Sequence, residues 1–124
     1  MFLVSNKLNM MLNYSLKKKS RLLKSIHFKY VFKKHVIQKK TELVILGRPN
    51  LLGYPRLGIS ISRKNIKYAY KRNIIKRLIR ETFRVLQHKL TFMDFIVIAK
   101  KNIIFLNNKN IINILENLWL NYHQ

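Results

Sequence analysis

Two repeating patterns of hydrophobic residues divide most of this chain into helices and strands. Apolar side chains three or four residues apart are typical of helices, and this spacing covers residues 20–34, 68–88 and 111–122. Alternation, or a short apolar run between turn residues, predicts strands over residues 40–48, 57–62 and 94–100. This order of elements predicts one small α/β domain over residues 20–124, with a three- or four-stranded sheet.

Turn and cap residues mark where these elements begin and end. Residues 47–55 carry both prolines and two of the three glycines, so they predict a loop after the first strand, which ends at Gly47. Ser20 or Ser25 is the expected cap of the first helix, and an asparagine at position 107, 108 or 110 that of the last. Residues 94–100 are almost entirely apolar and therefore predict a central strand.

The predicted helix over residues 68–88 has two chemically opposite sides. On a helical wheel one arc of about 140° is basic and the opposite side is apolar, with Phe83 at the boundary. The positions that form this basic face are Arg72, Asn73, Lys76, Arg77, Arg80 and Arg84. The apolar stripe consists of Ile75, Leu78, Ile79, Thr82 and Leu86. One side can therefore enter the core while the other presents cations.

A charged helix face is usually only solvated, and pairs of opposite charge commonly stabilise it. Here Arg72, Lys76 and Arg80 are like charges at successive i, i+4 positions, which disfavours the helix by a few tenths of a kcal/mol per pair. The only acidic residue nearby is Glu81, at the edge of the arc. We therefore favour an external polyanion as the partner, since arginine binds phosphate in a bidentate way.

Composition supports the same conclusion. The 124 residues include 26 lysines and arginines but only four acids, giving a formal net charge of +22. Such an excess points to a nucleic acid or another anionic surface. There is no cysteine, no apolar run of membrane-spanning length and no convincing signal peptide, so we expect a cytoplasmic protein without a membrane partner. Residues 1–19 are expected to be a mobile basic arm, with Met10 and Met11 as alternative translation starts.

The residues needed for hydrolysis by the protein itself are scattered. Glu42, Glu81, Asp94 and Glu116 fall on different predicted elements, and the four histidines form no metal-binding pair. We therefore predict no catalytic residue and no metal site in the protein. If the chain takes part in a reaction, the catalytic groups belong to another molecule.

Aromatic side chains within the first predicted helix allow two interpretations. Phe28, Val31 and Phe32 share one face, and this spacing favours packing in the core. The alternative is a platform on which unpaired bases stack, because aromatic rings among cations serve that purpose.

The runs LGISISRKNIKYAYKRNIIKRLIRETFR and MDFIVIAKK, with RLLKSIHFKYVF before them, resemble the protein subunit of bacterial ribonuclease P. The resemblance covers about residues 21–122. It implies an α+β two-layer sandwich with a mixed, mainly four-stranded sheet, about three helices and a left-handed βαβ crossover. It also implies a catalytic RNA subunit that uses Mg²⁺ to remove the 5′ leader of precursor tRNA, with no obligate protein partner.

The resemblance assigns residues to two surfaces. Positions matching the basic run that faces the RNA subunit are Arg72, Asn73, Lys76, Arg77 and Arg80. Positions matching the leader-binding cleft are Phe28, Phe32, Ser60 and Lys64, with Arg21 nearby. Ile74 stands where the family pattern has a second arginine, but it lies outside the basic arc.

Three other classes of protein would share some of these features. A ribosomal protein would have similar size and charge, a membrane-active protein a basic amphipathic helix, and a protein-only nuclease an RNA-binding surface. The predicted strands disfavour the second class and the scattered acids the third. Cleavage of precursor tRNA that requires an added RNA subunit would separate the ribonuclease P interpretation from all three.

Overall fold

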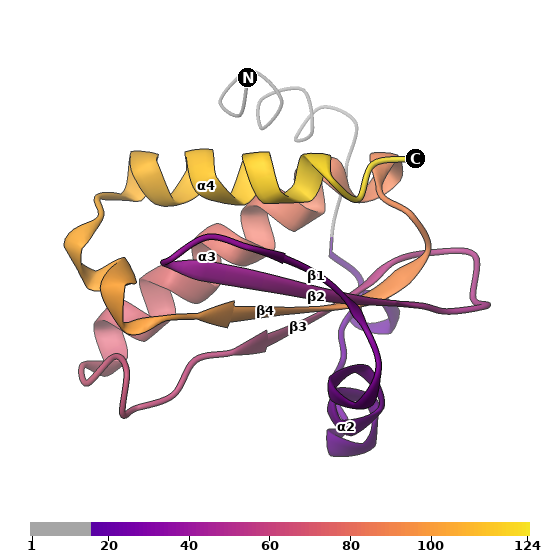
Figure 1. Cartoon of the computed structure of the whole chain (residues 1–124), viewed down its shortest axis with the longest axis horizontal. Helices are drawn as coiled ribbons and strands as arrows, with labels where there is room; N and C mark the ends of the chain where they lie inside the picture. The colour runs from indigo at the N-terminus through magenta and orange to yellow at the C-terminus, as the bar shows by residue number, and fades with distance from the viewer. Residues whose placement is uncertain (1–15) are drawn as a thin grey trace.

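A mixed sheet is the frame of the structure, a computed structural model that describes residues 16–124 (Figure 1). Its four strands within that range are ordered β1-β2-β4-β3. Their bounds are Val36–Lys39 (β1), Leu43–Pro49 (β2), Arg56–Ser60 (β3) and Met93–Ala99 (β4). Neighbours are antiparallel except β3 and β4, which are parallel. The strand predicted to be central, β4, does lie inside the sheet.

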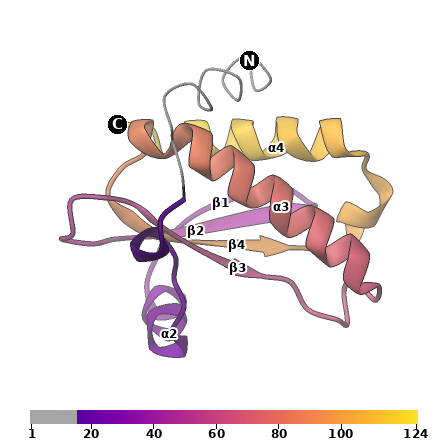
Figure 2. The same cartoon turned by 180° about the vertical axis from the view of Figure 1, so that it is seen from behind.

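Three α-helices in the described part of the chain cover the two faces of the sheet unequally (Figures 1 and 2). Helices α3 (Ala69–Leu86) and α4 (Asn108–Leu120) pack on one face, and the short α2 (Ser25–Lys33) packs on the other. Short 3₁₀ turns complete the chain at Lys18–Ser20 (η1), Gln87–Lys89 (η2) and Lys101–Phe105 (η3). The predicted α+β fold is confirmed.

The main core lies under α3 and α4, where aromatic rings pack against the sheet. Phe95 on β4 contacts Trp119 edge-on, with ring centroids 5.1 Å apart, and Phe83 on α3 lies 5.6 Å from Trp119. Phe83 is fully buried, so its predicted position at the boundary of α3 was wrong. The predicted stripe of the last helix is confirmed: Ile111, Leu115, Leu118, Trp119 and Tyr122 are all buried.

The smaller core lies under α2 on the opposite face. Val31 packs there with Leu22, Val44, Leu46 and Ile96, all of them buried. Because α2 has only nine residues, it covers one end of this face. No helix of the described residues covers the rest of this face, and Ile98 and Ser60 on it are half-buried.

Several boundaries differ from the prediction. The first helix begins at Ser25 and not at Ser20, because Arg21 and Leu22 are extended along β3, where the N–H of Leu22 donates to the carbonyl of Leu57. Strand β1 was not predicted at all. Strand β2 continues two residues beyond Gly47, and β3 ends at Ser60. The cap of α4 is Asn107, whose side chain accepts from the N–H of Asn110.

The parallel strands β3 and β4 are joined through α3, as a βαβ crossover requires. Its left-handedness stays a prediction. Residues 1–15 of the expected basic arm lie outside the described residues, whereas Leu16 packs against the main core.

Candidate nucleic-acid interface

Helix α3 has the two sides that its sequence predicted. Ile75, Ile79 and Thr82 are buried, and the Thr82 hydroxyl accepts a hydrogen bond from the Trp119 indole at 3.3 Å. Asn73, Arg77 and Arg80 are exposed, and Arg72 and Lys76 are half-buried. Arg84 forms an ion pair with Glu81 on the same helix, so we define the basic face as Arg72, Asn73, Lys76, Arg77 and Arg80.

Arg72 also holds the loop that precedes the helix. Its Nη1 donates to the carbonyl oxygens of Ile66 at 2.7 Å and Lys67 at 2.9 Å. Ile66 is buried and anchors the same loop in the core. Arg72 therefore positions the segment between β3 and α3 in addition to presenting charge. This role could not be predicted from the sequence, because both acceptors are backbone atoms.

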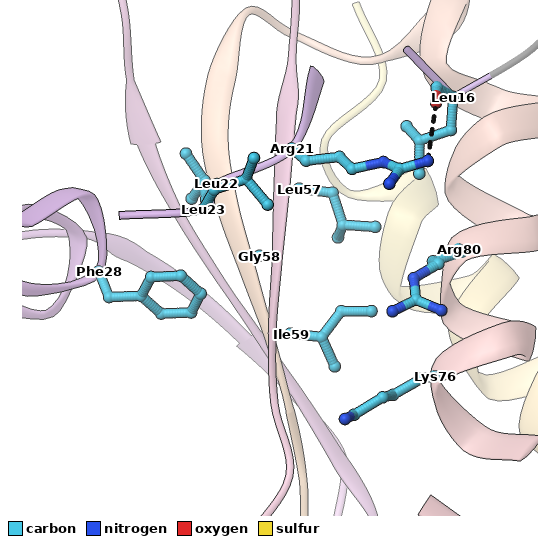
Figure 3. A pocket seen from close by; sticks show the side chains of 10 residues that line it. All are labelled: Leu16, Arg21, Leu22, Leu23, Phe28, Leu57, Gly58, Ile59, Lys76 and Arg80. Atoms are coloured by element: carbon cyan, nitrogen blue, oxygen red, sulfur yellow. Dashed lines mark hydrogen bonds between the residues drawn. The ribbon is translucent and has the colours of Figure 1, made fainter. Parts of the chain in front are cut away.

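A pocket of about 170 Å³ lies along the outer edge of β3 (Figure 3). Three cations from two segments reach it: Arg21 before α2, and Lys76 and Arg80 from α3. The Arg21 guanidinium is held by a hydrogen bond from Nη2 to the carbonyl of Leu16 at 3.2 Å. The rest of this edge pocket is lined by Leu16, Leu22, Leu23, Phe28, Leu57, Gly58 and Ile59. Such a mixture of cations and apolar surface suits a polyanion with flat bases.

Phe28 lies across the backbone of Gly58 and forms one wall of the edge pocket (Figure 3). A Cβ atom at position 58 would lie only 2.7 Å from Cζ of Phe28. Glycine is therefore required for the ring to approach β3 closely. Phe32 lies one turn further along α2, with its ring centroid 6.5 Å from that of Phe28.

The core interpretation of the α2 face was wrong for Phe32, which is 45% exposed, and right for Val31, which is fully buried. Phe28 is half-buried. Val31 belongs to the buried cluster around Ile96, and Phe28 packs against that cluster from its edge, whereas Phe32 is not part of it.

The other predicted site residues surround the edge pocket without lining it. Ser60 is half-exposed and, two residues beyond Gly58 on β3, lies on the same side of the sheet as Phe28. Lys64 is exposed in the turn that follows β3. Asn73 and Arg77 lie on the exposed side of α3. The structure therefore brings together Arg21, Phe28, Lys76 and Arg80. It leaves outside the pocket Phe32, Ser60, Lys64, Arg72, Asn73 and Arg77.

One basic contact near α2 was missed by the sequence analysis. The Arg48 guanidinium carbon lies 3.3 Å from the centre of the Tyr30 ring, and Nη1 donates to the Tyr30 carbonyl at 2.7 Å. The two residues are 18 positions apart, so no local pattern reveals the contact. It places a further cation at the end of β2 beside α2.

The carboxylate of Asp94 is engaged in a structural network. Asp94 is buried and accepts from Nε of Arg56 at 2.8 Å, from Nη2 at 2.7 Å and from the Asn50 amide at 2.9 Å. The hydrogen bond to Asp94 raises the pKa of Arg56 above its usual value. This pair joins β3 to β4 at the start of both strands.

Burial raises the pKa of Glu116 on α4 above its usual value. Among residues 16–124, no three histidine or acidic side chains are grouped closely enough to hold a metal ion. Nor does any helix in that range have the length and apolar character needed to cross a membrane.

Comparison with known proteins gives one consistent result. The family model for ribonuclease P matches residues 16–123. The ribonuclease P protein component of Buchnera aphidicola subsp. Schizaphis graminum is 67% identical over 114 residues, which is 92% of this chain and 100% of that protein. The corresponding protein of Edwardsiella ictaluri is 46% identical, over 88% of this chain and 92% of its own length.

Solved structures show the same likeness. The ribonuclease P protein of Staphylococcus aureus superposes with a TM-score of 0.75 at 34% identity, covering 80% of this chain and 91% of that one. The protein from Thermotoga maritima gives a TM-score of 0.74 at 29% identity, covering 84% and 98%.

Proposed function

Because this chain belongs to the ribonuclease P protein component family, we propose that it binds both the catalytic RNA of ribonuclease P and the 5′ leader of precursor tRNA. Membership makes it a subunit of an endoribonuclease that acts in tRNA processing. The proposal concerns which of its surfaces meets which RNA, and which partner supplies the catalytic groups.

The basic face of α3 is the proposed docking surface for the RNA subunit. Asn73, Arg77 and Arg80 are exposed on one helix, so their spacing is fixed by its backbone. A rigid row of hydrogen-bond donors that includes two arginines suits the phosphates of a folded RNA, which lie at fixed positions. Exposed arginines also remain hydrated in the free protein, and their planar guanidinium groups can donate two parallel hydrogen bonds to phosphate oxygens.

The sheet surface beside α2 is the proposed path of the leader. Phe28 and Phe32 provide flat rings and Ser60 a hydroxyl group, while Arg21 at the edge of β3 and Lys64 in the turn after it provide cations. A single strand binds such a surface through stacking and phosphate contacts with little sequence preference. The leader therefore needs no base-specific pocket.

We assign the catalytic groups to the RNA subunit, with Mg²⁺ serving the assembled enzyme. The acids that hydrolysis by the protein would require have structural roles here: Asp94 binds Arg56 and Glu81 binds Arg84. The protein instead contributes positive charge at the place where two RNA chains would meet. That charge lowers the repulsion between enzyme RNA and substrate.

The observation that carries this proposal is the edge pocket. Arg21 and Phe28 come from the leader-binding set, Lys76 and Arg80 from the RNA-binding set, and all four line one pocket. A surface on which both sets meet would hold the leader next to the catalytic RNA. A ribosomal protein would need only one continuous RNA-binding surface, and the relatives found are ribonuclease P proteins.

The test is cleavage of precursor tRNA at low Mg²⁺ concentration, with protein alone, with the cognate ribonuclease P RNA alone, and with both. We expect cleavage at the mature 5′ end only in the combined reaction. Cleavage by the protein alone would contradict the assignment of catalysis to RNA. A combined reaction no faster than the RNA alone would contradict the role of the protein.

A further inference from the structure

A second group of exposed apolar side chains comes from the start of α3 and from η3. Both segments lie at the end of the sheet away from α2 (Figures 1 and 2). The group contains two tyrosines and an isoleucine near the start of the helix and two residues of η3. We define this aromatic patch as Tyr68, Tyr70, Ile74, Ile104 and Phe105. Phe105 is 84% exposed and Tyr70 60%, so burial within this chain does not explain these residues.

The patch surrounds a shallow pocket with a buried floor. Tyr70 and Ile74 from α3 and Ile104 from η3 line a pocket of about 110 Å³, and Ile75, Ile103 and Ile111 beneath them are buried. The rings of Tyr68 and Tyr70 lie beside one another, with centroids 5.8 Å apart and planes tilted by 30°. The pocket is therefore built from three rigid elements: α3, η3 and the first turn of α4.

Several cations accompany the patch. Lys71 lines the pocket, and Nζ of Lys67 lies 5.7 Å from the centre of the Tyr68 ring. Lys101 belongs to η3 and Lys109 to the first turn of α4. The first turns of α3, η3 and α4 contain no acidic residue. Lysines beside exposed rings attract a polyanion and repel a second copy of this chain, whose net charge is also positive.

The patch and the basic face share one helix. Tyr70, Ile74 and Arg77 are spaced at i, i+4 and i+7, so they follow one side of α3 over about 10 Å. An RNA docked on Arg77 would therefore reach the patch without a change of direction. Ile74 would meet it with an apolar side chain at the position where the family pattern has an arginine.

We propose that the aromatic patch binds one or two unpaired nucleobases of the ribonuclease P RNA, while the neighbouring lysines contact the flanking phosphates. Exposed rings among cations are the chemistry by which proteins hold unpaired bases. The inference rests on the proposed docking of the RNA subunit on α3, and it adds a stacking contact to a surface otherwise read as purely electrostatic.

Equilibrium binding of the full chain to its cognate ribonuclease P RNA, at several salt concentrations, tests this. Tyr70→Ala should weaken binding roughly 5- to 50-fold with an unchanged salt dependence, because a stacked base releases no counterions. Tyr70→Phe should retain the affinity. Lys71→Gln should reduce the slope of log K against log salt by about 0.7–0.9, the loss of one phosphate contact. Leu51→Ser, which removes an exposed apolar side chain from the 50–55 loop, is the matched control and should change nothing.

An affinity for Tyr70→Ala equal to that of the wild-type protein would overturn the inference while leaving the proposed function intact. Failure of the wild-type protein to bind the RNA would overturn both. A change in sedimentation mass without a change in RNA affinity would assign the patch to self-association and also overturn the inference. Because Tyr70 is exposed, the melting temperature of the variants should match that of the wild-type protein.

Discussion

The basic face of α3 and the surface around the edge pocket are built in opposite ways. The basic face comes from one helix, and its cations are neighbours because they are three or four residues apart. The edge pocket takes Arg21 from an extended segment, Phe28 from α2, Gly58 from β3 and Lys76 from α3. A surface of the first kind survives as long as the helix folds, whereas one of the second kind depends on how four segments pack.

The two surfaces also differ in the interaction they offer. On the basic face the partner meets charge, and binding should depend steeply on salt. In the edge pocket aromatic and aliphatic groups contribute alongside the cations, so stacking should supply part of the affinity. The comparison predicts that substitutions in the two regions can be separated by partner and by salt dependence.

The largest effect is expected on the basic face. Arg77→Ala and Arg80→Ala should each weaken binding of the RNA subunit roughly tenfold or more, since a hydrogen bond to a charged group contributes about 1.5–3 kcal/mol. The slope of log K against log salt should also fall. Filter binding at several salt concentrations measures both quantities. Lys40→Ala, an exposed cation in the turn between β1 and β2, is the control, and an equal loss there would mean that charge alone decides binding.

Next in size is a substitution that displaces an aromatic ring. Gly58→Ala places a Cβ 2.7 Å from Cζ of Phe28 and 3.1 Å from Cβ of Leu22. Overpacking should lower the free energy of unfolding by about 1–3 kcal/mol and weaken binding of leader-bearing precursor tRNA by the assembled enzyme. Denaturation and substrate binding provide the two readouts.

Two further variants distinguish the loss of the Phe28 contact from a general loss of stability. Adding Phe28→Ala to Gly58→Ala should restore part of the stability but none of the leader affinity. Gly53→Ala strains a backbone with φ of +79° but meets no atom within 4 Å. It should therefore destabilise the protein without changing its affinity for leader-bearing precursor tRNA. Equal affinity for that substrate in all these variants would show that Phe28 does not contact the leader.

A smaller effect is expected on α2, where one substitution should change leader binding and its neighbour should change stability. Phe32→Ala should weaken binding of leader-bearing substrate about fivefold, the lower end of the range for one stacked base, and leave stability nearly unchanged. Val31→Ala should do the reverse and lower the free energy of unfolding by about 1–3 kcal/mol, because Val31 is fully buried. Similar behaviour of the two variants would show that α2 presents no distinct binding side.

The smallest effect concerns Arg72, which belongs to the basic face and also holds the loop between β3 and α3. Arg72→Lys keeps the charge but removes the hydrogen bonds to the carbonyls of Ile66 and Lys67. The loop that carries Lys64 should loosen, so affinity for both the RNA subunit and the leader should fall two- to fivefold, corresponding to about 1 kcal/mol or less. The salt slope should not change. A loss confined to the RNA subunit would mean that Arg72 acts only as a phosphate ligand.

The same contrast explains which parts of the fold could be predicted from the sequence. Helices α3 and α4 and the buried strand β4 follow local periodicity, and their predicted bounds were correct to within three residues. The start of α2 was wrong because pairing of Arg21 with Leu57, 36 positions away, overrides local helix preference. Strand β1 was missed because three of its four residues are exposed, and the pattern that would mark it is absent.

Site residues divide in the same manner. The basic face could be predicted as a group, since one helical period specifies it. The proximity of Phe28 to Gly58, the second role of Arg72 and the contact of Arg48 with Tyr30 could not, because each depends on segments that only the fold brings together. Phe83 was misplaced because the rings of Phe95 and Trp119 extend the core around the side of α3.

The central claim is that leader and RNA subunit bind different parts of one surface. Its most direct test is the affinity of the assembled enzyme for precursor tRNA with a leader and for mature tRNA without one, measured for the wild-type protein, Phe32→Ala and Arg77→Ala. At saturating RNA subunit, we expect Phe32→Ala to weaken binding of the leader-bearing substrate alone, and Arg77→Ala to affect assembly with the RNA subunit instead. An equal loss for both substrates with Phe32→Ala, or a loss specific to the leader with Arg77→Ala, would contradict the account.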